Sequence, residues 1–376
     1  MNIFNIIPKK SCNFYCTLFF LLISSLFFHS LPARGNNDLP AFDVNISGRG
    51  FNWISVHPDG EQWLITECTD RIAPPRENCF LFLYNIKTKR YRRYDLPSSY
   101  FYSDAQFSTN GQMIVAIRRP IPNGDSHTEL ERVYGESEIF LMNTEGKNFR
   151  TIPLIKGRYK TPLISPDETK VTYWRARIAR PEGSKTLISG YELHEFDLRL
   201  ENDSLFSSAT GFFLAGQFQY KNSNQIVADA YGPFFSEKTR FNYFKKFNFS
   251  QIYCFSQGIE KLGDPCITEV AWASKPSFDL SGNLYLYGQH QKYGVGFFEM
   301  SGQEINFFWK LPLLADQGIS ALMAAPSGNY LAFIYPTASA RRFKNHRALG
   351  LFDIRSERWI SVSPPQPETS ETIPLL

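Results

Sequence analysis

Residues 53–65 read Trp-Ile-Ser-Val-His-Pro-Asp-Gly-Glu-Gln-Trp-Leu-Ile, and this stretch decides the fold. An apolar run is followed by the tight turn His57-Pro58-Asp59-Gly60 and by a second apolar run. Later copies of the turn are Ser108-Thr109-Asn110-Gly111, Ser165-Pro166-Asp167-Glu168, Asn222-Ser223-Asn224, Ser281-Gly282 and Ala325-Pro326-Ser327-Gly328. Their last residues lie 51, 57, 56, 58 and 46 positions apart. This period is too long for a helical solenoid and fits one four-stranded blade plus a loop.

The run after each turn is short and rich in β-branched and aromatic residues, as in Val171-Thr172-Tyr173-Trp174, which is typical of a strand. A second strand with a polar turn follows in each copy, as in Leu351-Phe352-Asp353-Ile354-Arg355. Two hairpins per repeat make one antiparallel blade. The sequence therefore predicts an all-β, six-bladed propeller, in which the copy near 218–255 is degenerate.

These repeats resemble the propeller of the TolB family, whose signature is a Ser-Pro-Asp-Gly turn between the first two strands of a blade. The resemblance covers roughly residues 47–363. Family members carry an α/β domain ahead of the propeller, whereas about 17 residues separate Ala33 from the first blade here, so we expect that domain to be lacking. The resemblance implies a fold and not an activity, because propellers support many functions.

The first 33 residues have the features of a secretory signal peptide. Lys9 and Lys10 precede an apolar run at 17–28, and the small residue Ala33 follows. The alternative is an uncleaved membrane anchor, although the apolar run is shorter than the roughly 20 residues that a span needs. We expect cleavage, a periplasmic or secreted mature chain and no stable membrane insertion. The predicted organisation is signal peptide 1–33, a ring-closing N-terminal segment 34–46, propeller 47–363 and a loose, proline-rich tail 364–376.

Four of the six cysteines lie after the signal segment. An even number in an exported chain suggests disulfides, and the sequence-local pairing is Cys68 with Cys79 and Cys254 with Cys266. The alternative is that all four are free core residues. No Cys-x-x-Cys is present, which argues against a zinc site.

The longest segments of each repeat fall between its second and third strands and should decorate one face of the propeller. They run roughly over 70–78, 118–138, 175–190, 229–251, 288–294 and 336–348. Loops on a rigid scaffold tend to carry function, so this face is the predicted binding face. The predicted contacts are Arg175, Arg177, Arg180, Arg341, Arg342, Lys344 and Arg347, with Phe241, Tyr243 and Phe244 as apolar anchors.

We call these basic residues the basic arc, and arginine forks there would suit a protein partner or an anionic ligand. The alternatives are ordinary solvated loop charges and aromatics that pack back onto the blade. Nucleic acid is not expected, since 40 basic and 36 acidic residues give a net charge of only +4.

Catalytic motifs are missing from the sequence: there is no Gly-x-Ser-x-Gly and no His-Glu-x-x-His. His127, His290 and His346 share the insertion face and are the one arrangement that would assemble a metal site. Our first hypothesis is a noncatalytic exported scaffold with no cofactor, metal or catalytic residue. The alternative is a metal-dependent carbohydrate lyase or hydrolase, and a weaker one is a remnant that associates with a separate catalytic partner.

Overall fold

The computed structural model describes residues 50–70, 77–124, 126–179, 187–212, 214–232, 250–258, 265–302, 304–311, 318–336, 347–362 and 372–373. The predicted signal segment, residues 34–46 and most of the tail lie outside the described residues. No helix in the part of the chain that the structure describes is long and apolar enough to cross a membrane.

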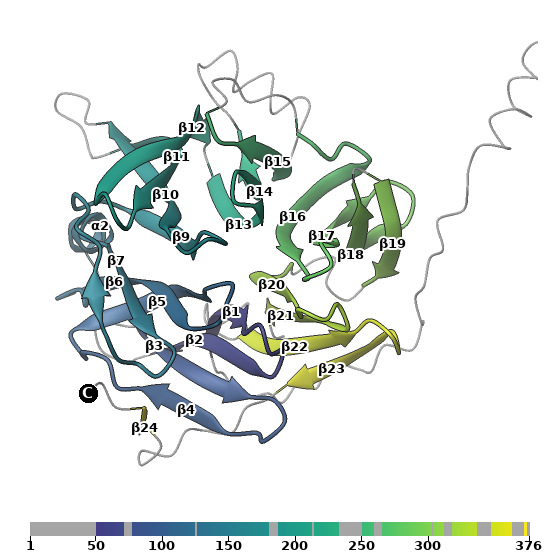
Figure 1. Ribbon diagram of the computed structural model, residues 1–376, viewed down its shortest axis with the longest axis horizontal. Coiled ribbons are helices and arrows are strands. Elements are labelled where there is room, and N and C mark those ends of the chain that lie inside the picture. Colours follow the sequence, from purple (N-terminus) through teal and green to yellow (C-terminus); the bar gives the residue numbers. More distant parts are fainter. Residues whose placement is uncertain are drawn as a thin grey trace, which may run out of the picture.

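The described strands fall into consecutive antiparallel sets arranged in a ring, and we call each set a blade (Figure 1). Blade 1 has β1 (Gly50–Val56), β2 (Gln62–Asp70), β3 (Glu77–Asn85) and β4 (Tyr91–Tyr94). Blade 2 has β5 (Tyr100–Phe107), β6 (Met113–Pro120), β7 (Glu138–Asn143) and β8 (Arg150–Thr151), with helix α2 (His127–Gly135) between β6 and β7. Blade 3 has β9 (Tyr159–Ile164), β10 (Lys170–Ala179), β11 (Leu187–Asp197) and β12 (Asn202–Phe212).

The remaining strands continue the ring. Blade 4 has three strands among the described residues, β13 (Leu214–Asn222), β14 (Gln225–Tyr231) and β15 (Gln251–Ser256). Blade 5 has β16 (Val270–Phe278), β17 (Leu284–His290), β18 (Gly294–Ser301) and β19 (Glu304–Lys310). Blade 6 has β20 (Ala321–Ala324), β21 (Tyr330–Pro336), β22 (Arg347–Asp353) and β23 (Arg358–Val362). The prediction of an all-β propeller of antiparallel blades is confirmed.

The first strand of each blade is the innermost one, and these strands contact one another around the centre (Figure 1). The predicted turns join the first and second strands, so they gather at one end of the strands. Gly60, for example, has φ 72°, which suits glycine, while Glu168 holds the same place in blade 3 with φ 59°. We call this end the turn face, and the opposite end, which carries α2, the insertion face.

A separate apolar core lies between each pair of neighbouring blades. Leu64 of blade 1 and Ile114 of blade 2 belong to one such cluster, and Trp174 of blade 3 and Phe218 of blade 4 belong to another. All four side chains are fully buried. Burial of apolar surface, at roughly 25 cal/mol per Å², therefore holds the blades to one another as well as within themselves.

Blades 1 and 6 are joined where Gly50 of β1 pairs in parallel with Arg347 of β22. Ring closure by residues 42–46, which the sequence suggested, lies outside the described residues. The tail differs from its prediction at one point, because β24 (Thr372–Ile373) pairs in parallel with β4.

Both predicted disulfides are present. Cys68 on β2 lies directly opposite Cys79 on β3, and the two sulfurs are bonded. Cys254 on β15 is bonded to Cys266. The first pairing follows from the antiparallel hairpin of β2 and β3. Cys266 lies outside the strands, where its N–H donates to the Ile252 carbonyl of β15 at 2.9 Å and so places its sulfur beside Cys254.

Two predicted insertions are not loops of the expected kind. In blade 5, residues 288–290 and 294 belong to paired strands, and only residues 291–293 form a tight turn between them. In blade 3, β10 continues to Ala179 and β11 starts at Leu187, so most of 175–190 is strand. Arg175 and Arg177 therefore lie on a strand and not in a loop, because apolar positions such as Trp174 and Ala176 keep the alternation of a half-buried strand.

Candidate functional site

A cavity of about 440 Å³ opens at the turn face, at the centre of the ring. It lies where the innermost strands end and the tight turns begin. Every blade contributes to its wall, for example through Ser55, Gln106, Leu163, Gln219, Ser277 and Met323. We call it the central cavity.

The rim of the central cavity is made of turns that are hydrogen-bonded to one another. The ring nitrogen Nε2 of His57 in the first turn lies 3.2 Å from the Gly111 carbonyl in the second. Asn110 donates to the Glu168 carboxylate at 2.8 Å, which joins the second turn to the third. The backbone N–H of Leu280 donates to Pro326 at 3.0 Å and joins the fifth turn to the sixth. These bonds hold the rim in one shape before any partner arrives.

His57 occupies the position at which the second and third turns carry serine. Like those serine hydroxyls, its imidazole accepts a hydrogen bond from a backbone N–H near the turn. Its Nδ1 accepts from the backbone N–H of Asp59 at 3.2 Å. Nδ1 also lies 3.0 Å from the Asp59 carboxylate, and Nε2 faces the Gly111 carbonyl, which can only accept. The ring therefore contacts the backbone of its own turn and of the next one.

Buried polar side chains join the innermost strands behind the rim. The Ser55 hydroxyl accepts from the Phe107 N–H of blade 2 at 3.2 Å, and the Ser277 hydroxyl accepts from the Ala324 N–H of blade 6 at 2.9 Å. Gln106 donates to a blade 3 carbonyl at 3.0 Å. A buried N–H or carbonyl without a partner is costly, so these side chains both satisfy the backbone and fix the wall.

Gln217 of blade 4 reaches two other blades and lies next to Met323 at the bottom of the cavity. It is 1% exposed and donates to Pro276 of blade 5 at 3.0 Å. It also pairs with Leu322 of blade 6, donating to its carbonyl at 2.5 Å and accepting from its N–H at 3.4 Å. One amide thus ties three blades together beneath the cavity.

The wall combines apolar surface with mainly neutral hydrogen-bonding groups and two charged residues, Lys221 and Asp279. Leu280 on the rim is 72% exposed although it is apolar, and Pro58, Pro166 and Pro326 line the wall from three turns. Of the charged lining residues, Asp279 is committed to its own blade, because it accepts from the N–H of Asn283 at 2.9 Å. Such a wall suits a peptide segment that is mainly apolar and carries a few hydrogen-bonding groups. It offers few groups for acid–base chemistry.

Three innermost strands carry a bulge on the insertion-face side of the cavity. Asp104 and Thr161 each lie four residues before the first residue of their turn, and Lys275 lies four residues before Asp279, where the hydrogen-bonded turn of blade 5 begins. Their φ angles are 53°, 51° and 58°. Positive φ is uncommon outside glycine and is a genuine outlier for β-branched threonine. The Asp104 carboxylate accepts from the Thr161 N–H at 3.1 Å, so the bulges of blades 2 and 3 support one another.

Among the predicted contact residues, the structure describes Arg175, Arg177 and Arg347. Arg175 pairs with Asp203 at 3.0 Å, Arg177 lies 3.9 Å from Glu192, and Arg347 donates to Asn52. The structure does not bring the three together at the central cavity, whose wall contains none of them. The remaining predicted contacts, Arg180, Phe241, Tyr243, Phe244, Arg341, Arg342 and Lys344, lie outside the described residues.

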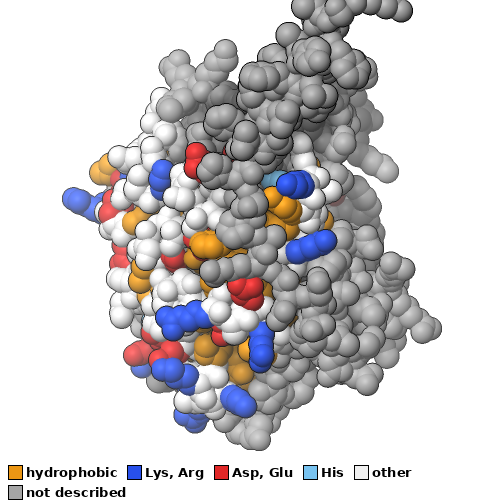
Figure 2. Space-filling model, turned by 90° about the vertical axis from the view of Figure 1, so that its right-hand side faces the viewer, with side chains coloured by type: hydrophobic (Ala, Val, Ile, Leu, Met, Phe, Trp, Pro, Cys, Tyr) orange, Lys and Arg blue, Asp and Glu red, His pale blue; other side chains and the backbone are white. Residues whose placement is uncertain are grey.

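Charge on the described surface is mixed. Figure 2 shows basic and acidic side chains interspersed over the described part of the side that it faces. Within the described residues the basic arc is therefore represented by arginines that already have intramolecular partners.

Of the three histidines predicted to share the insertion face, only His290 has its side chain among the described residues. His290 ends β17, stacks on Tyr293 and accepts from the N–H of Lys292 at 3.0 Å. Burial lowers its pKa, and Lys292 lowers the pKa further while Glu269 opposes both. His346 and the side chain of His127 lie outside what is described. No group of three or more His, Cys, Asp or Glu able to hold a metal occurs among the described residues.

The central cavity was not predicted from the sequence, although one signal for it was present. Ser55 and Gln106 lie two positions before their turns, and Ser277 lies two positions before Asp279, where the hydrogen-bonded turn of blade 5 begins. An inward apolar side chain would fit the strand pattern at these positions. All three are buried and bond the next blade. Polar residues at one repeated strand position indicate contacts along the inner wall, and the turn face is where those strands end.

Comparison of the sequence with protein-family models gives no match, and comparison with curated proteins gives none either. Comparison of the structure finds TolB from Acinetobacter baumannii at a TM-score of 0.53 and 13% identity, over 88% of this chain and 66% of that one. It also finds an acylaminoacyl peptidase from Pyrococcus horikoshii at a TM-score of 0.51 and 12% identity, over 85% of this chain and 46% of that one. An oligogalacturonate lyase in complex with manganese matches at a TM-score of 0.50 and 11% identity, over 85% of this chain and 78% of that one.

This chain therefore spans just under two thirds of the length of the TolB structure and less than half of the peptidase. Identities of 11–13% establish a common architecture only. TolB, a peptidase and a lyase differ in what they do, and what they share with this chain is the fold. The fold of this chain is that of a β-propeller similar to the one in TolB.

Proposed function

We propose that the protein is an exported, noncatalytic propeller scaffold that binds a segment of a protein partner in the central cavity. The observation that carries the proposal is the wall of that cavity. All blades contribute to it, its rim is fixed by hydrogen bonds between turns, and it exposes apolar side chains such as Leu280. A preorganised apolar pocket with a few neutral polar groups is typical of ligand and peptide recognition.

Export is supported by the two disulfides, which form and persist in oxidising compartments. The signal-like features of residues 1–33 point the same way. On this proposal the mature chain acts in a periplasm or outside the cell.

The basic arc remains a proposal for a second contact surface. Arg341, Arg342 and Arg347 come from one repeat, and their joint reversal to glutamate changes six units of charge. If this surface binds a partner or an anionic ligand, the reversal should weaken binding and remove most of its salt dependence.

The test compares four forms of the mature chain as baits in an envelope extract: wild type, Leu280→Arg, Leu200→Arg and the Arg341, Arg342, Arg347 reversal. Leu200 is the matched control, because it is a leucine of nearly equal exposure, 74%, on an outer turn of blade 3 at the same face. The proposal expects a partner that Leu200→Arg retains and Leu280→Arg loses. A partner lost only by the arginine reversal would place binding on the basic arc and contradict the cavity assignment.

A further inference from the structure

Two arginines at the insertion face share one aromatic ring. The guanidinium carbon of Arg119, on β6, lies 5.1 Å from the ring centre of Tyr134, on α2. The guanidinium carbon of Arg158, just before β9, lies 4.7 Å from the same ring centre. The two charged groups are therefore within about 10 Å of each other. Like charges at this distance repel unless something of opposite charge lies nearby.

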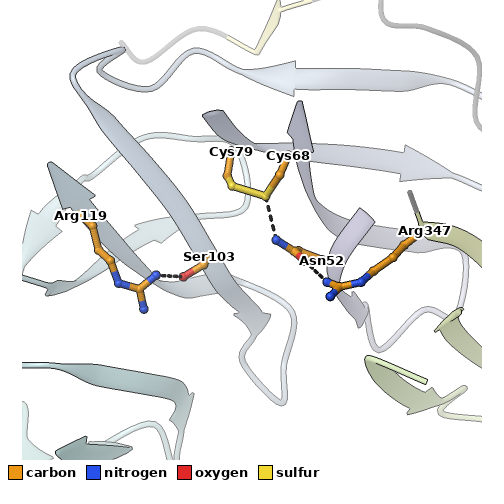
Figure 3. Close-up of a disulfide and its surroundings, with 6 residues drawn as sticks. All are labelled: Asn52, Cys68, Cys79, Ser103, Arg119 and Arg347. Carbon is orange, nitrogen blue, oxygen red and sulfur yellow. Dashed lines mark hydrogen bonds between the residues drawn. A yellow bond between two sulfur atoms is a disulfide. The ribbon is translucent and has the colours of Figure 1, made fainter. Parts of the chain in front are cut away.

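The hydrogen-bond partners of Arg119 are all neutral. Its Nε donates to the Ser137 hydroxyl at 3.0 Å, and its terminal nitrogens donate to Ser103 at 3.1 Å and to the Tyr159 carbonyl at 3.4 Å. Figure 3 shows Arg119 reaching Ser103, while Arg347 approaches Asn52 from another blade. These bonds fix the orientation of the Arg119 guanidinium without neutralising its charge. Two of its five N–H donors remain available for a ligand.

The Arg158 guanidinium has no hydrogen-bond or ion-pair partner among the described residues, although the Arg158 backbone carbonyl accepts from the Ala176 N–H. Its Nε is buried and lacks an acceptor. Leaving a charged donor without an acceptor is costly, because the group loses water and gains nothing in return. Its contact with the Tyr134 ring offsets only part of this cost.

The carboxylates on α2, just after it and at the start of β7 already have partners, and Glu131 on α2 is among them. Glu129 and Glu136 both bind Arg132, at 2.6 and 2.8 Å. Glu138 binds Arg118 at 2.7 Å. The end of α2 does not replace them, since its last carbonyls already accept from the Glu136 N–H and the Ser137 hydroxyl.

The surface around the pair is open to a ligand. Tyr134 is 38% exposed, and Ile155 is 75% exposed. Lys156, between Ile155 and Arg158 in the chain, is also exposed and adds a third positive charge to those of Arg119 and Arg158. An exposed aromatic ring beside unneutralised arginine forks suits a ligand with an anionic group and some apolar surface.

We propose that Arg119, Arg158 and Tyr134 form a binding site for an oxyanion, either a carboxylate or a phosphate group. The free donors of both forks would bind its oxygens, and Tyr134 would contact the attached carbon framework. Arg119 lies six residues along β6 from Met113, the strand's first residue after its tight turn, which is roughly 20 Å. The site is therefore separate from the central cavity and does not depend on the function proposed for it.

The test is titration calorimetry of the full mature chain with inorganic phosphate and, separately, with acetate, in chloride buffer. The two probes distinguish a phosphate site from a carboxylate site. Arg158→Gln is the main variant, because the Arg158 guanidinium makes no described hydrogen bond whose loss would disturb the fold. Arg355→Gln is the matched control, since Arg355 is exposed in a turn at the other end of the strands and its change removes the same charge.

We expect wild type and Arg355→Gln to bind at least one probe with a millimolar Kd, and Arg158→Gln to bind it at least about tenfold more weakly. Arg119→Gln should show the same loss, with circular dichroism confirming that it is folded. Equal binding by Arg158→Gln and wild type would overturn the proposal. Failure of wild type to bind either probe at about 20 mM, a concentration well above a millimolar Kd, would overturn it as well.

Discussion

Asn52 joins the Cys68–Cys79 disulfide of blade 1 to Arg347 of blade 6 (Figure 3). Its amide nitrogen donates to the Cys68 sulfur at 2.9 Å, and its amide oxygen accepts from the Arg347 guanidinium. Asn52 lies at the bulge of β1, close to where Gly50 pairs with β22. One side chain therefore supports both a disulfide and the junction between the first and last blades.

Replacing Asn52 with alanine should lower the free energy of unfolding by about 2 kcal/mol, because one of its two hydrogen bonds involves a charged group. Urea unfolding followed by tryptophan fluorescence measures the change. Asn306→Ala is the control, since Asn306 is exposed and the bond from its amide to Glu299 lies at the surface, where it should contribute less than about 0.5 kcal/mol. Equal losses for the two variants would contradict a special role for Asn52.

Removing the Cys68–Cys79 bridge, by changing both cysteines to alanine, should cost about 3 kcal/mol through the entropy of the unfolded chain. The comparison is made by denaturation with and without a reducing agent. Reductant should destabilise the wild type and a Cys254→Ala, Cys266→Ala variant, which keeps the Cys68–Cys79 bridge. It should have a smaller effect on the variant that lacks Cys68 and Cys79. A wild type insensitive to reductant under conditions that reduce both bridges would be the opposing result.

Gln217→Ala should destabilise the protein by about 3 kcal/mol, because the groups of Pro276 and Leu322 that it satisfies are buried. Gln112, which is exposed in the second tight turn, provides the control variant Gln112→Ala. Thermal unfolding of both variants checks the difference. If Gln217→Ala unfolds at the wild-type temperature, the amide does not tie the three blades together.

The stability of blade 3 should depend on pH through Asp203. Burial alone would raise the pKa of this carboxyl, but hydrogen bonds from His194 and Tyr173 and the charges of His194 and Arg175 outweigh it and hold the pKa below its ordinary value. A lowered pKa means that the ionised group stabilises the fold. This contribution is complete above the unfolded pKa near 4 and is lost as the pH falls through the folded pKa.

Asp203→Asn should therefore be less stable than wild type at about pH 7, and the gap should narrow below about pH 4. Unfolding measured across this range tests the sign. Glu145→Gln serves as the control, because Glu145 is exposed and lies 3.9 Å from Lys147, its ion-pair partner. A gap for Asp203→Asn that stays constant with pH would show that Asp203 acts by shape and not by charge.

The fold was predictable because its determinants are local. A turn such as His57-Pro58-Asp59-Gly60 fixes a hairpin on its own, and repetition of the hairpin leaves few architectures. The disulfides were predictable for the same reason, since Cys68 and Cys79 belong to one hairpin. Helix α2 also had a local signal that the strand-based interpretation passed over: Ser126 caps the helix by accepting from the Glu129 N–H at 3.2 Å.

The candidate sites were not predictable in this way, because each depends on contacts between different blades. Gln217 lies 105 residues from Leu322, and only the closed ring brings them together. Arg119 and Arg158 likewise meet on Tyr134 only because α2 lies over the junction of blades 2 and 3. A sequence pattern can identify which residues are polar in a strand, but the curvature of the ring decides which of them share a wall.

The most direct test of the central claim is photo-cross-linking from the rim of the central cavity. A photoreactive amino acid is placed at Leu280 in one form of the mature chain and at Leu200 in another, and each form is irradiated in an envelope extract. The proposed function predicts a discrete adduct from position 280 that position 200 does not give and that a peptide from the captured partner competes away. The same adducts from both positions, or none from position 280, would contradict binding at the central cavity.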